Sequence, residues 1–316
     1  MRILVFGAGA VGQAVGCMLS VSGHSVDLII RQRYLEALRS GGLQVTGIFG
    51  DYTAPRNRVR FFDSMDDISD QTYDYVLVTT KSYDTPDAVS SLLSLRDQSF
   101  FIVSMQNGCG NVECLTGSFG DDRTLGARVI TGFAIINPGL VRITVTADAV
   151  HIGGVHEGDT PSPAIVFADM LSRAGLPAEP TAYIFYDLYA KLLYNSALNP
   201  LGAALGVHYG ALGDDPDARQ IMDRIIDEVF SVLDSIDGRT HWDTADEYRQ
   251  FFYGTQIPAT YDHRSSMLQD LEAGKRTEID ALTGWVADHG KNNGIQTPVC
   301  DTITAMIRFL ERSRRG

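Results

Sequence analysis

The sequence predicts two domains, a doubly wound α/β domain over residues 1–182 and an all-helical domain over residues 183–316. In the first part, short runs rich in β-branched and aromatic residues alternate with helical patterns, as is typical of a doubly wound sheet. Beyond about residue 183 the strand patterns end and helical patterns dominate. A chain of 316 residues is long enough to form two domains, each with its own core.

The strands expected in the first domain are continuously apolar, which is typical of parallel strands covered on both faces. They lie at 2–6, 24–30, 74–80 and 100–105, with helices at 11–22, 32–40, 84–95 and 162–174 and a last short strand near 177–180. From 124 to 154 several strand patterns follow one another without a helix, so we expect the sheet to end in antiparallel strands. The helices expected in the second domain lie at 183–205, 215–236, 243–253, 265–272, 277–293 and 299–313.

The charge and composition of the chain argue against several classes of binding partner. The net charge is −13, which argues against nucleic acid, because phosphate binding needs a basic face. No run of about 18 apolar residues is present, so no membrane span is expected. The four cysteines form no CxxC pair and no Cys/His cluster with metal-ligand spacing, so we expect no metal site and a cytoplasmic location.

The segment Gly7-Ala8-Gly9-Ala10-Val11-Gly12 joins the first strand to the first helix. Gly7 permits a tight turn, Gly9 lets the backbone approach a pyrophosphate, and Gly12 allows close packing of helix and strand. A GxGxxG motif alone is weak evidence, but between a strand and a helix it is strong. The segment therefore predicts a Rossmann-like domain that binds a dinucleotide, in preference to a glycine-rich turn that binds nothing.

The residues at the end of the second strand indicate which dinucleotide the domain binds. An NAD site needs an acid there to accept a hydrogen bond from the ribose 2′-hydroxyl. This sequence has Arg31, with Arg33 close behind, and no acid. A guanidinium can bind a 2′-phosphate in a bidentate fork, so NADP(H) is the expected cofactor. Alternatively, Arg31 is only an exposed residue at the start of the next helix.

Lys81 and Asn107 follow two further strands of the first domain. Because the carboxyl ends of parallel strands meet at one edge of a sheet, both side chains should lie beside the glycine loop. We expect them to contact cofactor or substrate. Lys81 could equally be a solvated loop lysine, and Asn107 with Gly108 a plain turn.

In the second domain, Lys191, Asn195 and Asn199 are spaced four apart on one predicted helix and so share a face. We expect this face to carry no acid, to line a cleft between the domains and to point toward the cofactor. A lysine can provide positive charge and a proton for an alkoxide, and amides can orient that oxygen without titrating. A polar stripe that only contacts water is the alternative.

Two residues of the segment 264–285 are further candidates. Ser266 with Gln269 three residues later forms a capping-box pattern, so Ser266 should cap a helix. The N-terminus of that helix, with the Ser266 hydroxyl, could also hold a substrate carboxylate. Glu278 is expected in the first turn of the next helix, where the helix dipole favours an acid, and it could also orient the lysine or the cofactor.

These motifs together, in particular "KLLYNSALNPLGA" and "SSMLQDLEAGKRTEID", resemble the ketopantoate reductases (2-dehydropantoate 2-reductases) over nearly the whole chain. The resemblance implies a Rossmann-like domain, a helical domain related to that of 6-phosphogluconate dehydrogenases, and NADPH-dependent reduction of a small-molecule 2-oxo acid. It further implies Lys191 as general acid, Asn195, Asn199 and Ser266 as substrate contacts, and Glu278 as a positioning acid. Arg31 corresponds to the 2′-phosphate ligand, and Lys81 and Asn107 to residues around the nicotinamide and its ribose. A homodimer is a candidate assembly.

Two departures from the family pattern concern the substrate pocket. His263 stands where pantoate-making members often have an asparagine, and the segment before Lys191 lacks a frequent tryptophan. Both should alter the pocket wall more than the proton-transfer residues, so His263 is a candidate substrate contact. The alternatives are an NADPH-dependent reductase of a different carbonyl or imine and a non-catalytic NADPH-sensing module.

Overall fold

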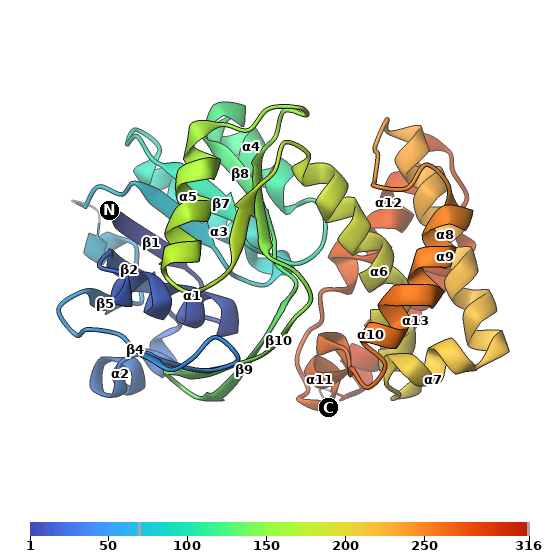
Figure 1. Ribbon diagram of the computed structural model, residues 1–316, viewed down its shortest axis with the longest axis horizontal. Helices are drawn as coiled ribbons and strands as arrows, with labels where there is room; N and C mark the ends of the chain where they lie inside the picture. Colours follow the sequence, from blue (N-terminus) through green and yellow to red (C-terminus); the bar gives the residue numbers. More distant parts are fainter. Residues whose placement is uncertain (69–70, 315–316) are drawn as a thin grey trace. The chain divides into compact units, whose positions relative to one another are not determined.

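The computed structural model describes residues 1–68 and 71–314 of the chain. It divides into two compact units. The first consists of Met1–Asn107 and Asn111–Ile184, and the second of Gly108–Gly110 and the chain from Phe185 onward. The first unit has the predicted doubly wound α/β fold and the second is all-helical, so the predicted fold class is confirmed (Figure 1).

An eight-stranded sheet forms the centre of the first unit. In spatial order its strands are β12 (Ala178–Pro180), β11 (Val150–Gly154), β8 (Thr124–Arg128), β7 (Phe101–Ser104), β6 (Tyr75–Val78), β1 (Arg2–Phe6), β2 (Ser25–Ile29) and β5 (Val59–Phe62). All neighbours from β8 to β5 are parallel. The chain builds the sheet from β1 toward β5 first and then from β6 outward, so the strand order reverses beside β1. Ligands of such sheets bind at this reversal.

Helices cover both faces of this sheet (Figure 1). Ile3 and Val5 of β1 pack in one core cluster with α1 (Ala10–Val21), α2 (Gln32–Gly41) and α5 (Ser162–Arg173). Leu4 points to the opposite face and packs with α3 (Thr85–Leu92) and α4 (Asn111–Phe119). Because both faces are buried, the central strands are almost continuously apolar, as their sequence predicts, and the buried Asp27 of β2 is paired with Arg60 of β5.

A second, four-stranded sheet corrects the prediction for residues 124–154. Its strand order is β4 (Tyr52–Thr53), β3 (Gln44–Gly47), β10 (Leu140–Thr146) and β9 (Thr131–Asn137). The predicted antiparallel end of the main sheet is right for the pair β8 and β11 but wrong for β9 and β10. The buried Val141 and Ile143 of β10 pack in the core cluster that contains α1, so this hairpin covers α1 instead of extending the main sheet.

The second unit is formed by helices around one core. They are α6 (Ile184–Leu205), α7 (Tyr209–Asp214), α8 (Pro216–Ser235), α9 (Ala245–Phe251), α10 (Ile257–Ala259), α11 (Ser266–Glu272), α12 (Thr283–Asn293) and α13 (Pro298–Arg314). Leu193 and Leu198 of α6 are fully buried in this core. None of the helices in the described part of the chain is both long enough and apolar enough to cross a membrane.

Several short elements differ from the prediction. The helices α4 and α7 and the π-helical turn Phe252–Gln256 were not predicted, because their short, glycine-containing segments show no sustained helical period. The helix expected over 277–293 begins only at Thr283, after the 3-10 turn Ile279–Ala281.

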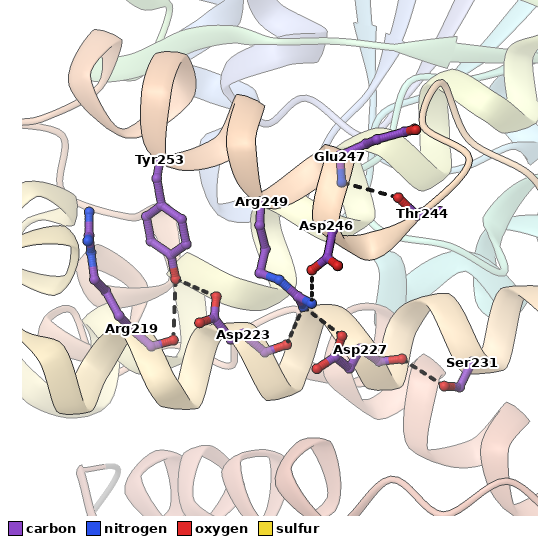
Figure 2. A network of polar contacts seen from close by, with 9 residues as sticks. All are labelled: Arg219, Asp223, Asp227, Ser231, Thr244, Asp246, Glu247, Arg249 and Tyr253. Carbon is purple, nitrogen blue, oxygen red and sulfur yellow. Dashed lines mark hydrogen bonds and ion pairs between the residues drawn. The ribbon is translucent and has the colours of Figure 1, made fainter.

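A polar network joins α9 and the π-helical turn to α8 (Figure 2). Arg249 donates to Asp246 of its own helix at 2.7 Å and to Asp227 of α8 at 2.6 Å. The Tyr253 hydroxyl donates to Asp223, one turn earlier on α8, at 2.8 Å. These contacts fix how α9 lies on α8 and therefore support the frame of the second unit.

Candidate functional site

The predicted cofactor residues follow four adjacent strands of the main sheet. Asn107 follows β7, Lys81 follows β6, the loop from Gly7 follows β1, and Arg31 follows β2. Since these strands are parallel neighbours, the four positions form one row at the carboxyl edge of the sheet. This edge of the first unit includes the point at which the strand order reverses.

The glycine loop leaves room for a ligand at one of its three glycines. A Cβ added to Gly12 would lie 2.2 Å from the Gly7 carbonyl oxygen, and one added to Gly7, which has a φ of +103°, would lie 2.7 Å from the Thr80 nitrogen. Both glycines are therefore required by the fold. At Gly9 an added Cβ would lie 3.8 Å from its nearest neighbour in the described chain, the Thr79 carbonyl oxygen. The Gly9 backbone thus has the open approach that a pyrophosphate needs, and Gly9 directly precedes α1.

Side chains that the sequence did not single out hold this loop in place. Gln13 donates from Nε2 to the Ala8 carbonyl at 2.7 Å and accepts from the Gly139 backbone N–H at 3.0 Å. The Thr79 hydroxyl donates to the Gly7 carbonyl. No local sequence pattern marks Gln13 or Thr79, because their partners become neighbours only in the folded sheet.

A buried amide network supports the loop around Asn107. Gln106 donates from Nε2 to the Thr85 hydroxyl at 2.8 Å, and that hydroxyl donates to Asn111 Oδ1 at 2.8 Å. Asn111 in turn donates to the Asn107 carbonyl at 2.9 Å. The backbone of Asn107 is therefore anchored to α3 and α4.

Arg31 forms an ion pair that the sequence did not indicate. It occupies the N-cap position of α2, and its Nη2 lies 3.2 Å from Oδ2 of Asp84, which follows β6. The sequence after β2 contains no acid close to Arg31, as predicted, but the fold brings the Asp84 carboxylate there from the segment that follows β6. Arg33 stacks on the ring of Tyr34, with its guanidinium carbon 4.7 Å from the ring centroid.

The predicted catalytic face lies on α6 in the second unit. Asn195 and Asn199 are buried and Lys191 is partly exposed. The expectation that the face carries no acid is wrong, because Asp187 lies one turn before Lys191 at the same spacing of four. Asp187 is buried, and its Oδ1 lies 2.9 Å from Nε2 of His241. The spacing could have identified Asp187 from the sequence.

Asn199 is connected to two residues from other elements. The Tyr209 hydroxyl donates to Asn199 Oδ1, and the Tyr209 ring lies 5.0 Å from that of His263, centroid to centroid. Burial raises the pKa of Tyr209 well above its ordinary value, so the hydroxyl stays protonated and remains a donor. Although His263 is exposed overall, desolvation of its ring lowers the pKa of His263. Tyr209 was missed by the sequence analysis because α7 was not predicted.

The predicted cap of α11 is off by one residue. Ser265, not Ser266, is the N-cap: its hydroxyl accepts from the Leu268 N–H at 3.0 Å and donates to the Asn199 carbonyl at 3.4 Å. Ser265 is fully buried, whereas Ser266 is the exposed first residue of the helix. With two adjacent serines, the capping pattern alone does not define the register. The Ser266 hydroxyl thus has no capping role.

Glu278 is buried but does not lie in the first turn of an α-helix, as was expected. It directly precedes the 3-10 turn Ile279–Ala281. The preceding residue, Thr277, is fully buried and donates to Glu311 of α13 from its backbone N–H at 2.6 Å and from its hydroxyl at 2.5 Å. The backbone beside Glu278 is therefore fixed by a charged group that the sequence did not indicate.

Comparison with known proteins identifies two family models along the chain. The model described as "Ketopantoate reductase PanE/ApbA" matches residues 3–157, and the one described as "Ketopantoate reductase PanE/ApbA C terminal" matches residues 184–311. A 2-dehydropantoate 2-reductase of Aquifex aeolicus is 35% identical to the chain, over 98% of this chain and 97% of that protein.

Solved structures with the same fold cover the whole chain. A PanE/ApbA family ketopantoate reductase from Ralstonia eutropha has a TM-score of 0.85 at 28% identity, and the match covers 100% of both chains. D-Mandelate dehydrogenase in a ternary structure with NADH and anilino(oxo)acetate has a TM-score of 0.88 at 25% identity, with 99% of both chains covered.

Proposed function

Because the chain belongs to the ketopantoate reductase family, we propose that it reduces a 2-oxo acid to a 2-hydroxy acid with NADPH, and that the substrate is 2-dehydropantoate. The observation that carries the proposal is the full-length similarity to a 2-dehydropantoate 2-reductase. The presence of Lys191, Asn195, Asn199 and Glu278 at the positions expected from the family pattern supports a catalytic protein over a sensor, since a sensor needs no proton donor.

The coenzyme would be held by residues of the first unit. The open backbone at Gly9 and the start of α1 would bind the pyrophosphate, and Arg31 the 2′-phosphate. Lys81 and Asn107 would contact the nicotinamide end. A bound reduced nicotinamide would supply the hydride that reduces C2 of the oxo acid.

Lys191 would supply the proton that completes the reduction. As C2 is reduced, negative charge develops on its oxygen, and the Lys191 ammonium both stabilises that charge and protonates the oxygen. Asn195 and Asn199 would orient the same oxygen. Because Asn199 Oδ1 already accepts from Tyr209, the free hydrogen-bonding capacity of Asn199 lies in its two N–H donors, which suit an oxyanion.

The substrate carboxylate would be bound by polar groups beside Asn199. The exposed Ser266 hydroxyl has no capping role and can donate to the carboxylate. His263, whose pKa is lowered by desolvation, would be neutral at pH 7 and would therefore act as a hydrogen-bond donor instead of a charge partner. Glu278 would orient the lysine or the coenzyme.

A panel of 2-oxo acids tests the proposal, with NADPH oxidation as the readout. We expect 2-dehydropantoate to have the highest kcat/KM. A higher kcat/KM for another 2-oxo acid would identify that acid as the substrate and would leave the proposed type of reaction unchanged. NADPH binding without oxidation by any member of the panel would contradict the reductase function and favour a sensing module.

A different 2-oxo acid is the second candidate substrate. The similarity to D-mandelate dehydrogenase, whose solved complex contains an aromatic oxo acid amide, favours an aromatic substrate. His263, beside the Tyr209 ring, is the pocket feature that supports it. The panel should therefore include 2-oxo-2-phenylacetate.

A further inference from the structure

Asp84 and Arg31 lie in the segments that follow the two strands on either side of β1. Arg31 follows β2 and Asp84 follows β6, and the strand order β6, β1, β2 places β1 between them. The 3.2 Å ion pair therefore joins the segments that flank the start of the glycine loop. Both residues belong to the first unit, and the pair lies at the edge where the coenzyme is proposed to bind.

The ion pair is not explained by local structure or by stability. Asp84 occupies the N-cap position of α3, where an aspartate ordinarily accepts from the first N–H groups of the helix. Within the described chain its carboxylate makes no such capping bond and instead contacts Arg31. The side chains of Arg31 and Asp84 are 64% and 31% exposed, and pairs in such solvent-accessible positions contribute little to folding.

We propose that Asp84 determines how strongly the protein discriminates between NADPH and NADH. This inference rests on the proposed role of Arg31 as the 2′-phosphate ligand. The carboxylate accepts from one nitrogen, Nη2, of the Arg31 guanidinium, so a 2′-phosphate would have to share this cation with it. The Asp84 carboxylate and a 2′-phosphate bound at Arg31 would also lie within a few ångströms of each other, and their like charges would repel.

For NADH the same carboxylate is favourable. The ribose 2′-hydroxyl of NADH is a hydrogen-bond donor, and NAD sites use an acid at the end of the second strand to accept from it. Here that acid would come from the segment after β6 instead of from β2. Arg31 and Asp84 thus favour opposite coenzymes, and the protein accepts both with a smaller preference than Arg31 alone would produce.

Direct binding measurements test this without requiring turnover. The dissociation constants of NADPH and NADH are measured by titration calorimetry for the full-length protein and for Asp84→Asn, Asp84→Ser, Arg31→Ala and Asp87→Asn. Asp87 lies in the first turn of the same helix and is exposed, so Asp87→Asn removes one negative charge near the same helix end without touching the Arg31 pair. Thermal melts establish that each variant is folded.

We expect both Asp84 variants to raise the NADPH-to-NADH affinity ratio by roughly tenfold, the size expected when a competing charge is removed from a partly exposed site. Asp87→Asn should change the ratio by less than about twofold. An unchanged ratio in both Asp84 variants, with Arg31→Ala lowering the ratio, would overturn the role of Asp84 and leave the NADPH proposal standing. An unchanged ratio in Arg31→Ala would overturn the 2′-phosphate assignment itself, and the inference with it.

Discussion

The hydroxyl of Tyr209 donates a hydrogen bond to Oδ1 of Asn199, and both side chains are buried in the second unit. An amide on its own can rotate and exchange its oxygen and nitrogen ends. Here the tyrosine occupies the acceptor end, so the donor end of Asn199 has a fixed orientation. A hydrogen bond between α7 and α6 thus decides which way the amide of Asn199 is turned.

Tyr209→Phe should therefore reduce catalysis by leaving Asn199 Oδ1 unpaired and its amide free to turn. We expect kcat/KM to fall about tenfold, and the free energy of unfolding by about 1 kcal/mol, as for loss of one buried hydrogen bond. Tyr194→Phe is the matched control, because the Tyr194 hydroxyl bonds Thr260 at 2.9 Å and its ring packs against that of Tyr209. Equal loss of kcat/KM in both variants would contradict a specific role for Tyr209.

Lys191→Ala should remove the proposed proton donor and leave coenzyme binding intact. We expect kcat to fall by about 10²-fold or more, because positioned proton donors contribute on that order. The dissociation constant of NADPH, measured by fluorescence titration, should stay within about twofold. A variant with normal kcat would exclude Lys191 from the mechanism.

The glycine loop allows the requirements of fold and of coenzyme binding to be separated. Gly12→Ala would place a Cβ 2.2 Å from a backbone oxygen, and we expect it to destabilise the protein by roughly 2 kcal/mol. At Gly9, φ is −71° and an added Cβ would lie 3.8 Å from the Thr79 carbonyl oxygen, so alanine fits the folded chain. Gly9→Ala should therefore keep the melting temperature but weaken NADPH binding at least tenfold if the pyrophosphate approaches this backbone. Normal NADPH affinity in Gly9→Ala would show that it does not.

Glu311 should be required for the local structure beside Glu278. Glu311→Ala leaves the buried N–H and hydroxyl of Thr277 without their acceptor, which we expect to lower the free energy of unfolding by about 2 kcal/mol and to lower kcat. Glu311→Gln keeps an oxygen that can accept both bonds and should be much milder. Glu272→Ala, which removes the exposed partner of Arg264, is the control for loss of a surface ion pair. Urea unfolding and steady-state kinetics of the three variants check this, and a mild Glu311→Ala would contradict it.

His263 should make stability depend on pH in a defined direction. Desolvation lowers the pKa of His263 in the folded protein below the value of about 6.5 expected in the unfolded chain. As the pH falls through about 6.5, the unfolded chain takes up the proton first, so protonation favours unfolding. The free energy of unfolding of the parent protein relative to His263→Asn should therefore decrease between about pH 7.5 and about pH 5. A difference that stays constant or increases in urea unfolding would contradict the lowered pKa.

Local sequence patterns were sufficient for the fold class and for most elements. Each strand or helix of the alternating pattern shows its own period within a short segment. The glycine loop and the spacing of Lys191, Asn195 and Asn199 are likewise contained within about one or two helical turns. The same reasoning failed for the hairpin of β9 and β10, because its local pattern fits either of two sheets equally well. It also failed at Ser265, because the capping pattern fits either of two neighbouring registers. It also overlooked Asp187, although the spacing of four was present.

The sequence by itself therefore determined which residues share a strand end or a helix face. Only the tertiary structure decided which side chains contact these residues: Asp84 contacts Arg31, Tyr209 contacts Asn199, and Glu311 contacts Thr277. These partners are 53, 10 and 34 residues apart in the chain. Periodicity reports which side of an element is buried, but a hydrogen bond between two elements depends on how their loops close and how their cores pack, and neither is encoded at the bonded residues themselves.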